Sequence, residues 1–106
     1  MLRLCLTCIF LFSFSDKLMA ADVARGEKLF AKCVACHGKT GMGKKSQKAP
    51  MLAGQFDWYI EQQILAIKNG TRSNNHAKKM IPYVKNLSES DIKDLASYIS
   101  TLDKKK

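Results

Sequence analysis

Two cysteines and a histidine stand close together in the segment Cys33-Val34-Ala35-Cys36-His37. One helical turn at this spacing presents both sulfurs to the two vinyl groups of a single porphyrin, where each can form a thioether. The next residue can then point its imidazole at the iron. This C-x-x-C-H spacing is the attachment pattern of c-type haem. The segment therefore predicts one haem c, covalently bound through Cys33 and Cys36, with His37 as an axial ligand.

Other chemistries of a C-x-x-C pair are a zinc half-site, a redox dithiol or two buried thiols. Zinc would need a second pair of ligands at suitable spacing, and a thioredoxin-like motif would need a βαβ setting. A second C-x-x-C does occur at Cys5 and Cys8, but Ile9 follows it instead of histidine and apolar residues surround it. We interpret this pair as part of a hydrophobic segment that the mature chain lacks.

The sixth position of a haem iron bound by His37 needs a second ligand or stays open. The methionines Met42 and Met51 lie in a lysine-rich segment soon after the motif, whereas Met80 lies farther along the chain, next to Pro82. We favour Met80, because the intervening chain is long enough to pass around a porphyrin. His76 is the alternative, and bis-His ligation would lower the reduction potential where a thioether ligand would raise it.

The first twenty residues have the layout of a secretory signal peptide. A short positive start with Arg3 precedes an apolar run over residues 4–14, which is too short to span a bilayer. The sequence thus predicts a cleaved signal peptide over 1–20 and one domain over 21–106, exported to the periplasm and without stable membrane insertion after cleavage. A retained leader acting as a membrane anchor is the alternative.

Length and net charge limit the classes of function that fit this chain. The chain has 106 residues and a formal net charge of +9, so it favours acidic partners. It carries no Arg-rich block and no recognisable nucleic-acid module, which argues against nucleic-acid binding. A mature chain this short buries limited apolar surface by itself, and a covalently held porphyrin would supply much of the missing core.

The elements that must position the motif read as helices. Asp22 is a plausible N-cap of a helix that runs into Cys33, with Gly26 and Phe30 on its inner face. Residues 38–54 are rich in glycine and lysine and predict a loop. A helix is expected over 55–69, ended by Gly70.

The rest of the chain completes an all-α prediction. Residues 71–79 are polar and expected to be irregular, and Pro82 should interrupt any helix that follows. Ser88 and Asp91 form an S-x-x-D start for a last helix, whose buried stripe reaches Leu102 and which finishes at residues 104–106. No segment requires a strand. The expected core of the 55–69 helix is aromatic and aliphatic, with Trp58 beside it and an apolar face of Phe56, Tyr59, Ile60, Ile64 and Ile67.

Three segments together resemble the class I cytochromes c, most closely the monohaem counterpart of the cytochrome c4/c553-type domain. They are residues 33–38, residues 49–55, and Met80 followed by Leu87-Ser88. The resemblance covers the whole mature chain and implies a small fold of three to four helices around the haem, with the first and last helices crossing at Gly26. Cytochrome c4 itself is a dihaem protein, whereas this chain has one C-x-x-C-H.

The resemblance also implies roles for single residues. His37 and Met80 would be the axial ligands, and the Pro50 carbonyl would accept a hydrogen bond from the other imidazole N–H. The residues Gln55, Tyr59 and Arg72 fall where such proteins approach the haem propionates.

The expected function is electron transfer without catalysis: a carrier that shuttles electrons between respiratory or other redox proteins with acidic surfaces, in transient contacts. Two other classes stay open. One is a haem sensor or small haem enzyme with an open sixth position, and the other is a non-haem metal or thiol protein. The lysines that would steer partners are Lys39, Lys44, Lys45, Lys48, Lys78 and Lys79.

Overall fold

A computed structural model describes residues 20–74 and 76–103. Within these ranges the chain forms α-helices and short 3-10 turns, and the only β-type pairing is an isolated bridge between Lys44 and Ala49. The all-α prediction is confirmed. In chain order the elements are α1 (Val23–Phe30), α2 (Val34–His37), η1 (Lys45–Gln47), α3 (Asp57–Lys68), η2 (Ala77–Met80), α4 (Ile81–Val84) and α5 (Glu89–Ser100).

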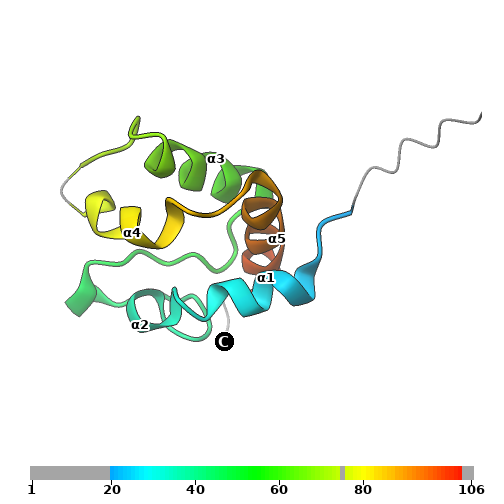
Figure 1. The fold of residues 1–106 in the computed structure, drawn as a ribbon. Coiled ribbons are helices and arrows are strands. Elements are labelled where there is room, and N and C mark those ends of the chain that lie inside the picture. The colour runs from blue at the N-terminus through cyan, green and yellow to red at the C-terminus, as the bar shows by residue number, and fades with distance from the viewer. Residues whose placement is uncertain (1–19, 75, 104–106) are drawn as a thin grey trace, which may run out of the picture.

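The crossing of α1 and α5 is the most extensive helix contact of the fold (Figure 1). Gly26 lies at the crossing point, where a Cβ atom would stand 2.0 Å from the backbone oxygen of Asp94. Four residues later, the ring of Phe30 lies 5.4 Å from that of Tyr98, measured between centroids. A glycine costs about 1 kcal/mol inside a helix, and here its missing side chain is what allows the two backbones to meet.

An ion-pair cluster fastens the same two helices at their starts. The guanidinium of Arg25 pairs with Asp91 and, at 3.2 Å, with Asp94. Asp94 is buried, and its second oxygen accepts a hydrogen bond from the Asp22 N–H at 2.8 Å. The cluster therefore satisfies a buried carboxylate on α5 with donors from the N-terminal end of α1.

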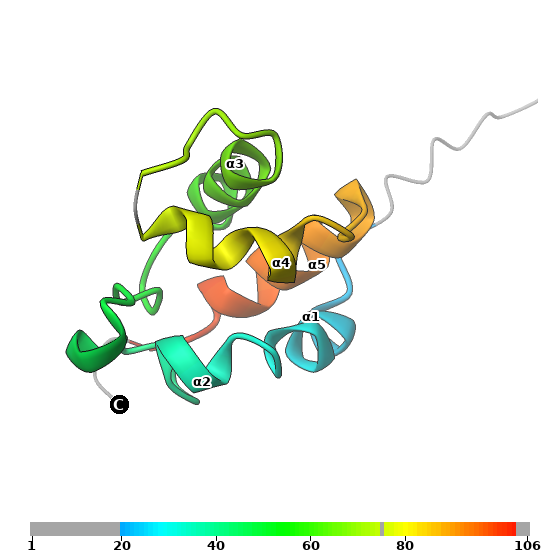
Figure 2. The ribbon, with the colours of Figure 1, turned by 60° about the vertical axis from the view of Figure 1, so that its left-hand side comes forward.

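The core lies where α3 and α5 pack against each other. Its buried side chains include Ile60, Ile64 and Ile67 from α3 and Ile92, Leu95 and Ile99 from α5. In a view turned by 60°, α4 lies in front between α3 and α2 (Figure 2). The isoleucines at helical spacing are therefore the ones that the core uses.

The prediction that the aromatic residues of the 55–69 segment belong to the core is wrong. Phe56, Trp58 and Tyr59 are exposed, with 68%, 55% and 39% of their surface accessible. Phe56 precedes the helix as its N-cap, and the rings of Phe56 and Trp58 stack on each other with centroids 6.0 Å apart. Burial on α3 is instead confined to the face that carries Ile60, Ile64 and Ile67, and these rings lie outside it.

Other expected elements also differ from the structure, and the helix expected over 55–69 spans only Asp57–Lys68. The first helix does not run into Cys33, because residues 31–33 form a turn between α1 and α2. The loop over 38–54 contains the single turn η1, and residues 77–79 belong to η2. Pro82 does not break α4, since it lies in the first turn, where a missing N–H costs no helical hydrogen bond.

The expected start of the last helix is confirmed. Asp91 N–H donates to the Ser88 hydroxyl and Ser88 N–H donates to the Asp91 carboxylate, each at 3.0 Å. This is a capping box, in which two backbone donors at the helix start are satisfied reciprocally.

Low pH should remove the stabilisation that the capping box of α5 provides. The Ser88 N–H, and then the Arg25 guanidinium, lower the pKa of Asp91 below its ordinary value. A carboxyl whose folded pKa is lowered stabilises the fold above its unfolded pKa, and the stability is lost as the pH falls through the folded pKa. We expect the unfolding free energy to fall less below about pH 4 in Asp91→Asn than in the wild type. Denaturant titrations from pH 6 to pH 2 measure this difference. Glu89→Gln, an exposed acid in the same turn, is the control and should follow the wild type.

Most of the predicted signal peptide, with Cys5 and Cys8, lies outside the described residues, as do Lys104–Lys106. Across residues 20–74 and 76–103, the structure contains no helix of the length and apolar character that a membrane crossing requires.

Candidate haem site

The C-x-x-C-H segment folds into one helical turn. The His37 N–H donates to the Cys33 carbonyl at 2.9 Å, and the Gly38 N–H donates to the Val34 carbonyl at 2.8 Å. Cys33 and Cys36 are both half-buried free thiols on this turn. Gly38 ends α2 with φ of 85°, a conformation that glycine adopts without strain.

The ring of His37 is buried and held by a backbone carbonyl. Its Nδ1 lies 2.9 Å from the Pro50 oxygen, and 5% of the residue's surface is accessible. A carbonyl only accepts hydrogen bonds, so Nδ1 carries a proton, and in the tautomer that this contact selects Nε2 keeps a lone pair. His37 is thus prepared to bind a metal through Nε2.

Burial also makes the first cysteine a poor nucleophile. Desolvation, and then the neighbouring Cys36, raise the pKa of Cys33 to about 11. Redox-active cysteines have lowered pKa values, because the thiolate is the reactive form. The structure therefore does not support the redox-dithiol alternative. Among the described residues, which do not include Cys5 and Cys8, no group of three or more His, Cys, Asp or Glu side chains could hold a metal ion.

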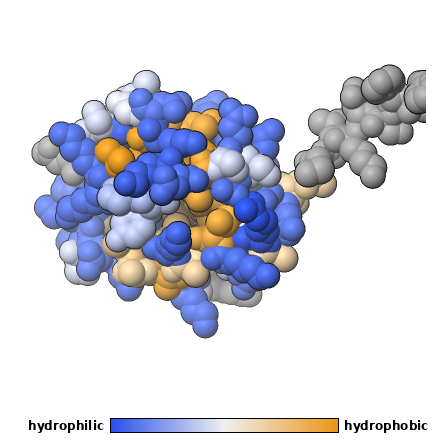
Figure 3. Space-filling model, viewed as in Figure 1, coloured by the Kyte–Doolittle hydropathy of each residue, from blue (hydrophilic) through white to orange (hydrophobic). Residues whose placement is uncertain are grey.

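A cavity of about 340 Å³ opens beside the motif. Cys33, Cys36 and His37 contribute one part of its wall, while the other part comes from η2 and α4, which lie apart from α2 in both ribbon views (Figures 1 and 2). Hydrophobic residues reach the surface on this face between α4 and α1, within a mostly hydrophilic exterior (Figure 3). The size is that of a small-molecule site.

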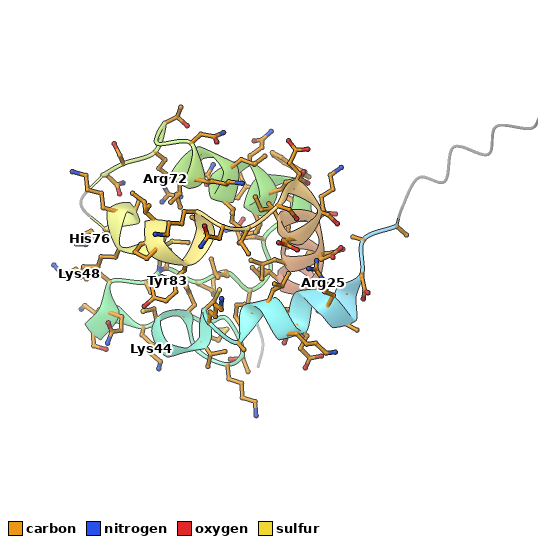
Figure 4. The ribbon with its side chains drawn as sticks, in the orientation of Figure 1. Arg25, Lys44, Lys48, Arg72, His76 and Tyr83 are labelled. Atoms are coloured by element: carbon orange, nitrogen blue, oxygen red, sulfur yellow. The ribbon has the colours of Figure 1, made fainter. Side chains whose placement is uncertain are left out.

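Met80 is the methionine that reaches this cavity. It is half-buried at the end of η2 and lines the cavity together with His37. Met42 and Met51 are each 39% exposed and do not line it. His76 also lines the cavity, but it is exposed and lies with Lys48 at one end of the molecule (Figure 4).

The remaining predicted residues divide between the cavity and the surface. Arg72 lines the cavity and donates a hydrogen bond to the Gln63 side chain at 2.9 Å. Pro50, whose carbonyl oxygen contacts His37 Nδ1, lines the cavity as well. Gln55 is half-buried and Tyr59 is exposed, and neither lines the cavity.

The cavity wall includes Tyr83, which the sequence prediction did not name, and Lys48, which it named only as a lysine that would steer partners. Tyr83, on α4, lines it and is 53% exposed (Figure 4). Lys48 lines it from a left-handed backbone conformation, with φ of 53°. The aromatic residue directly after Pro82 was a usable signal for Tyr83, whereas no sequence pattern marks a lysine with positive φ.

The donor set fits a covalently attached haem. Two thiols lie on one helical turn, an imidazole with a free Nε2 lies beside them, and a thioether sulfur lines the same cavity. Fold and site together define a small all-α protein built to enclose one porphyrin-sized cofactor.

Comparison with known proteins agrees with this class. Residues 23–103 match the protein family Cytochrome c, and the chain belongs to that family. It is 42% identical over 82 residues to cytochrome c-554(548) of Halomonas halodenitrificans, covering 77% of this chain and 98% of that protein. It is 37% identical to cytochrome c4 of Pseudomonas aeruginosa over 77% of this chain, but spans only 39% of that longer protein.

The fold agrees as well. Cytochrome c4 from Pseudomonas stutzeri superposes with a TM-score of 0.68 and 30% identity, over 76% of this chain and 47% of the other. The expected resemblance to class I cytochromes c is confirmed. These relatives indicate a covalently bound haem c and a role as a haem-based electron carrier.

Proposed function

We propose that this protein is a periplasmic electron carrier without catalytic activity, with one haem c attached through Cys33 and Cys36 and ligated by His37 and Met80. The observation that carries the proposal is the hydrogen bond from His37 Nδ1 to Pro50, which leaves Nε2 for a metal in the cavity that Met80 also lines. A haem bound there would supply a one-electron Fe(III)/Fe(II) couple.

The chain's own residues would keep that couple reversible. Buried His37 is fixed by Pro50, and half-buried Met80 belongs to a helical turn packed against the core. Neither side chain needs to move when an electron is gained or lost. Apolar wall residues such as Leu52, Ile67 and Val84 would limit water near the cofactor.

Basic residues surround the cavity and would guide partners. Lys32, Lys48, Lys79 and Arg72 line it, and Lys39, Lys44, Lys45 and Lys78 are exposed on the neighbouring segments. Such a surface attracts acidic redox proteins over distances that salt shortens. The dependence of the electron-transfer rate on ionic strength is the measurement that checks this part of the proposal.

A haemochrome assay tests the proposal directly. The full chain is expressed with a cytochrome c maturation system, and the periplasmic protein is purified. We expect an alkaline pyridine spectrum of c-type haem, at one haem per chain, and a haem that acid–acetone extraction does not remove.

The control is the variant Cys33→Ser/Cys36→Ser, which keeps His37 and Met80 but removes both attachment points. It should lose the extraction-resistant haem completely. A wild-type protein without a c-type haemochrome would refute the proposed function, and recovery of the intact leader on purified protein would refute signal cleavage.

A further inference from the structure

A set of contacts links Gly43 to both the backbone and the ring of His37. The Gly43 N–H donates to the His37 carbonyl at 2.8 Å. On its other side Gly43 touches the chain around Pro50, where a Cβ atom would lie 2.7 Å from the Ala49 oxygen and 2.8 Å from the Pro50 carbonyl carbon. The oxygen of that same Pro50 carbonyl contacts His37 Nδ1 at 2.9 Å. Gly43 therefore touches both the backbone of His37 and the group that orients its ring.

A second set of contacts ties the same loop to α2. Lys44 N–H donates to the Ala49 carbonyl at 3.0 Å, and Ala49 N–H donates to the Lys44 carbonyl at 3.1 Å. This bridge closes the loop that contains η1. The Lys44 ammonium also donates to the Ala35 carbonyl on α2 at 3.1 Å. The segment that delivers Pro50 is thus anchored to the helix that carries His37.

We propose that Gly43 is a positioning residue that holds the Pro50 carbonyl at His37 Nδ1 and thereby sets the reduction potential of the bound haem. The inference rests on the proposed function, in which His37 binds the iron. A carbonyl that accepts the Nδ1 proton makes the imidazole a stronger donor through Nε2. A stronger donor favours ferric iron, so this hydrogen bond lowers the reduction potential.

Any side chain at position 43 must displace the backbone of residues 49–51. The atoms nearest to its Cβ are all backbone atoms, which cannot rotate away as a flexible side chain would. The hydrogen bond from His37 Nδ1 to Pro50 would lengthen as a result. The imidazole would then donate less to the iron, and the reduction potential would rise.

The test compares holoprotein variants at three glycines with positive φ. Gly43→Ala should raise the potential, shifting the reduction equilibrium several-fold, where tenfold corresponds to about 59 mV. It should also speed the exchange of the His37 Nδ1 proton with solvent, followed by NMR of the reduced protein. A role in loop stability alone could speed proton exchange through local opening, but it would not raise the reduction potential.

Two glycines supply matched controls. Gly70→Ala introduces the same backbone strain, with φ of 80° against 81° at Gly43, but its Cβ meets nothing within 4 Å. Gly41→Ala disturbs the same loop, with its Cβ 2.8 Å from the Leu102 side chain and no contact with Pro50. Both should keep the wild-type reduction potential, whatever stability they lose.

A second substitution, which disturbs the backbone less, tests the proposal if the Gly43→Ala variant does not fold. Ala49→Gly adds no atom and loosens the residue before Pro50, so it should shift potential and exchange in the same direction by less. Unchanged values in Ala49→Gly, and in Gly43→Ala where it folds, would overturn the proposal, as would an equal shift in Gly41→Ala. A wild-type protein without haem would instead overturn the proposed function.

Discussion

The Met80→Ala variant should bind carbon monoxide in its reduced state, which the wild type should not do. Met80 is half-buried and lines the cavity with His37, and alanine in its place leaves no sulfur to occupy the sixth position. The weak far-red sulfur-to-iron band of the ferric protein should disappear. Because a thioether ligand raises the reduction potential, we expect the potential to fall by about 0.1 V or more, within the roughly 0.8 V that axial ligands span.

Two single variants separate the candidate ligands. Met42→Ala removes an exposed methionine of the loop and should leave the far-red band and the potential unchanged. His76→Ala should do the same, although His76 also lines the cavity. Loss of the native spectrum in His76→Ala but not in Met80→Ala would establish bis-His ligation instead. Carbon monoxide binding by the reduced wild type would favour the sensor or enzyme alternative.

His76 could also fill the position that Met80→Ala leaves open. The variant would then resist carbon monoxide, and its potential would fall further, because imidazole is a stronger donor than water. The double variant Met80→Ala/His76→Ala resolves this case, since it lacks both candidate ligands and should bind carbon monoxide even if His76 replaces Met80 in the single variant.

Gly26→Ala should destabilise the fold strongly, although alanine is the better helix former by about 1 kcal/mol. The added Cβ would lie 2.0 Å from the Asp94 oxygen and 2.6 Å from the Asp94 carbonyl carbon. These are backbone atoms of α5, so relief requires the two helices to separate. Overpacking costs typically 1–3 kcal/mol, and an overlap with backbone should cost about 3 kcal/mol or more. Denaturant unfolding of the ferric holoprotein measures this loss.

The matched control is Ala24→Gly, two residues earlier in the same helix, where the side chain is exposed. It makes the reverse substitution and should cost about 1 kcal/mol, from helix propensity alone. Gly26→Ala raises helix propensity and Ala24→Gly lowers it, yet both variants should lower the free energy of unfolding. The loss should be larger for Gly26→Ala. An unchanged or increased stability in Gly26→Ala would contradict the close crossing of α1 and α5.

Local sequence determined the parts of this protein whose physics is local. Cys33, Cys36 and His37 are spaced so that one helical turn, closed by the hydrogen bond from the His37 N–H to the Cys33 carbonyl, carries all three. Ser88 and Asp91 form their capping box for the same reason, since both partners lie within one turn. The isoleucines of α3 were identified as core by their helical spacing alone.

The tertiary structure decided which helix faces are buried by neighbouring elements. Periodicity predicts that Phe56, Tyr59 and Ile60 share a side of a helix, but burial depends on where the neighbouring elements lie. In the folded chain Phe56 precedes α3 and is exposed, as is Tyr59, while Ile60 is buried in the core. Among the methionines, sequence position favoured Met80, and the packing of η2 against the core brings it to the cavity.

The support of His37 depends on segments that meet only in the folded chain. The resemblance to cytochromes c implied the contact with Pro50, and the structure confirms it at 2.9 Å. It did not imply Gly43, which in the sequence is one of several glycines in a loop. The need for glycine there arises from the close approach of Ala49, Pro50 and Met51. A sequence specifies which residues can form such a support, but the distances between them exist only once the loop has closed against α2.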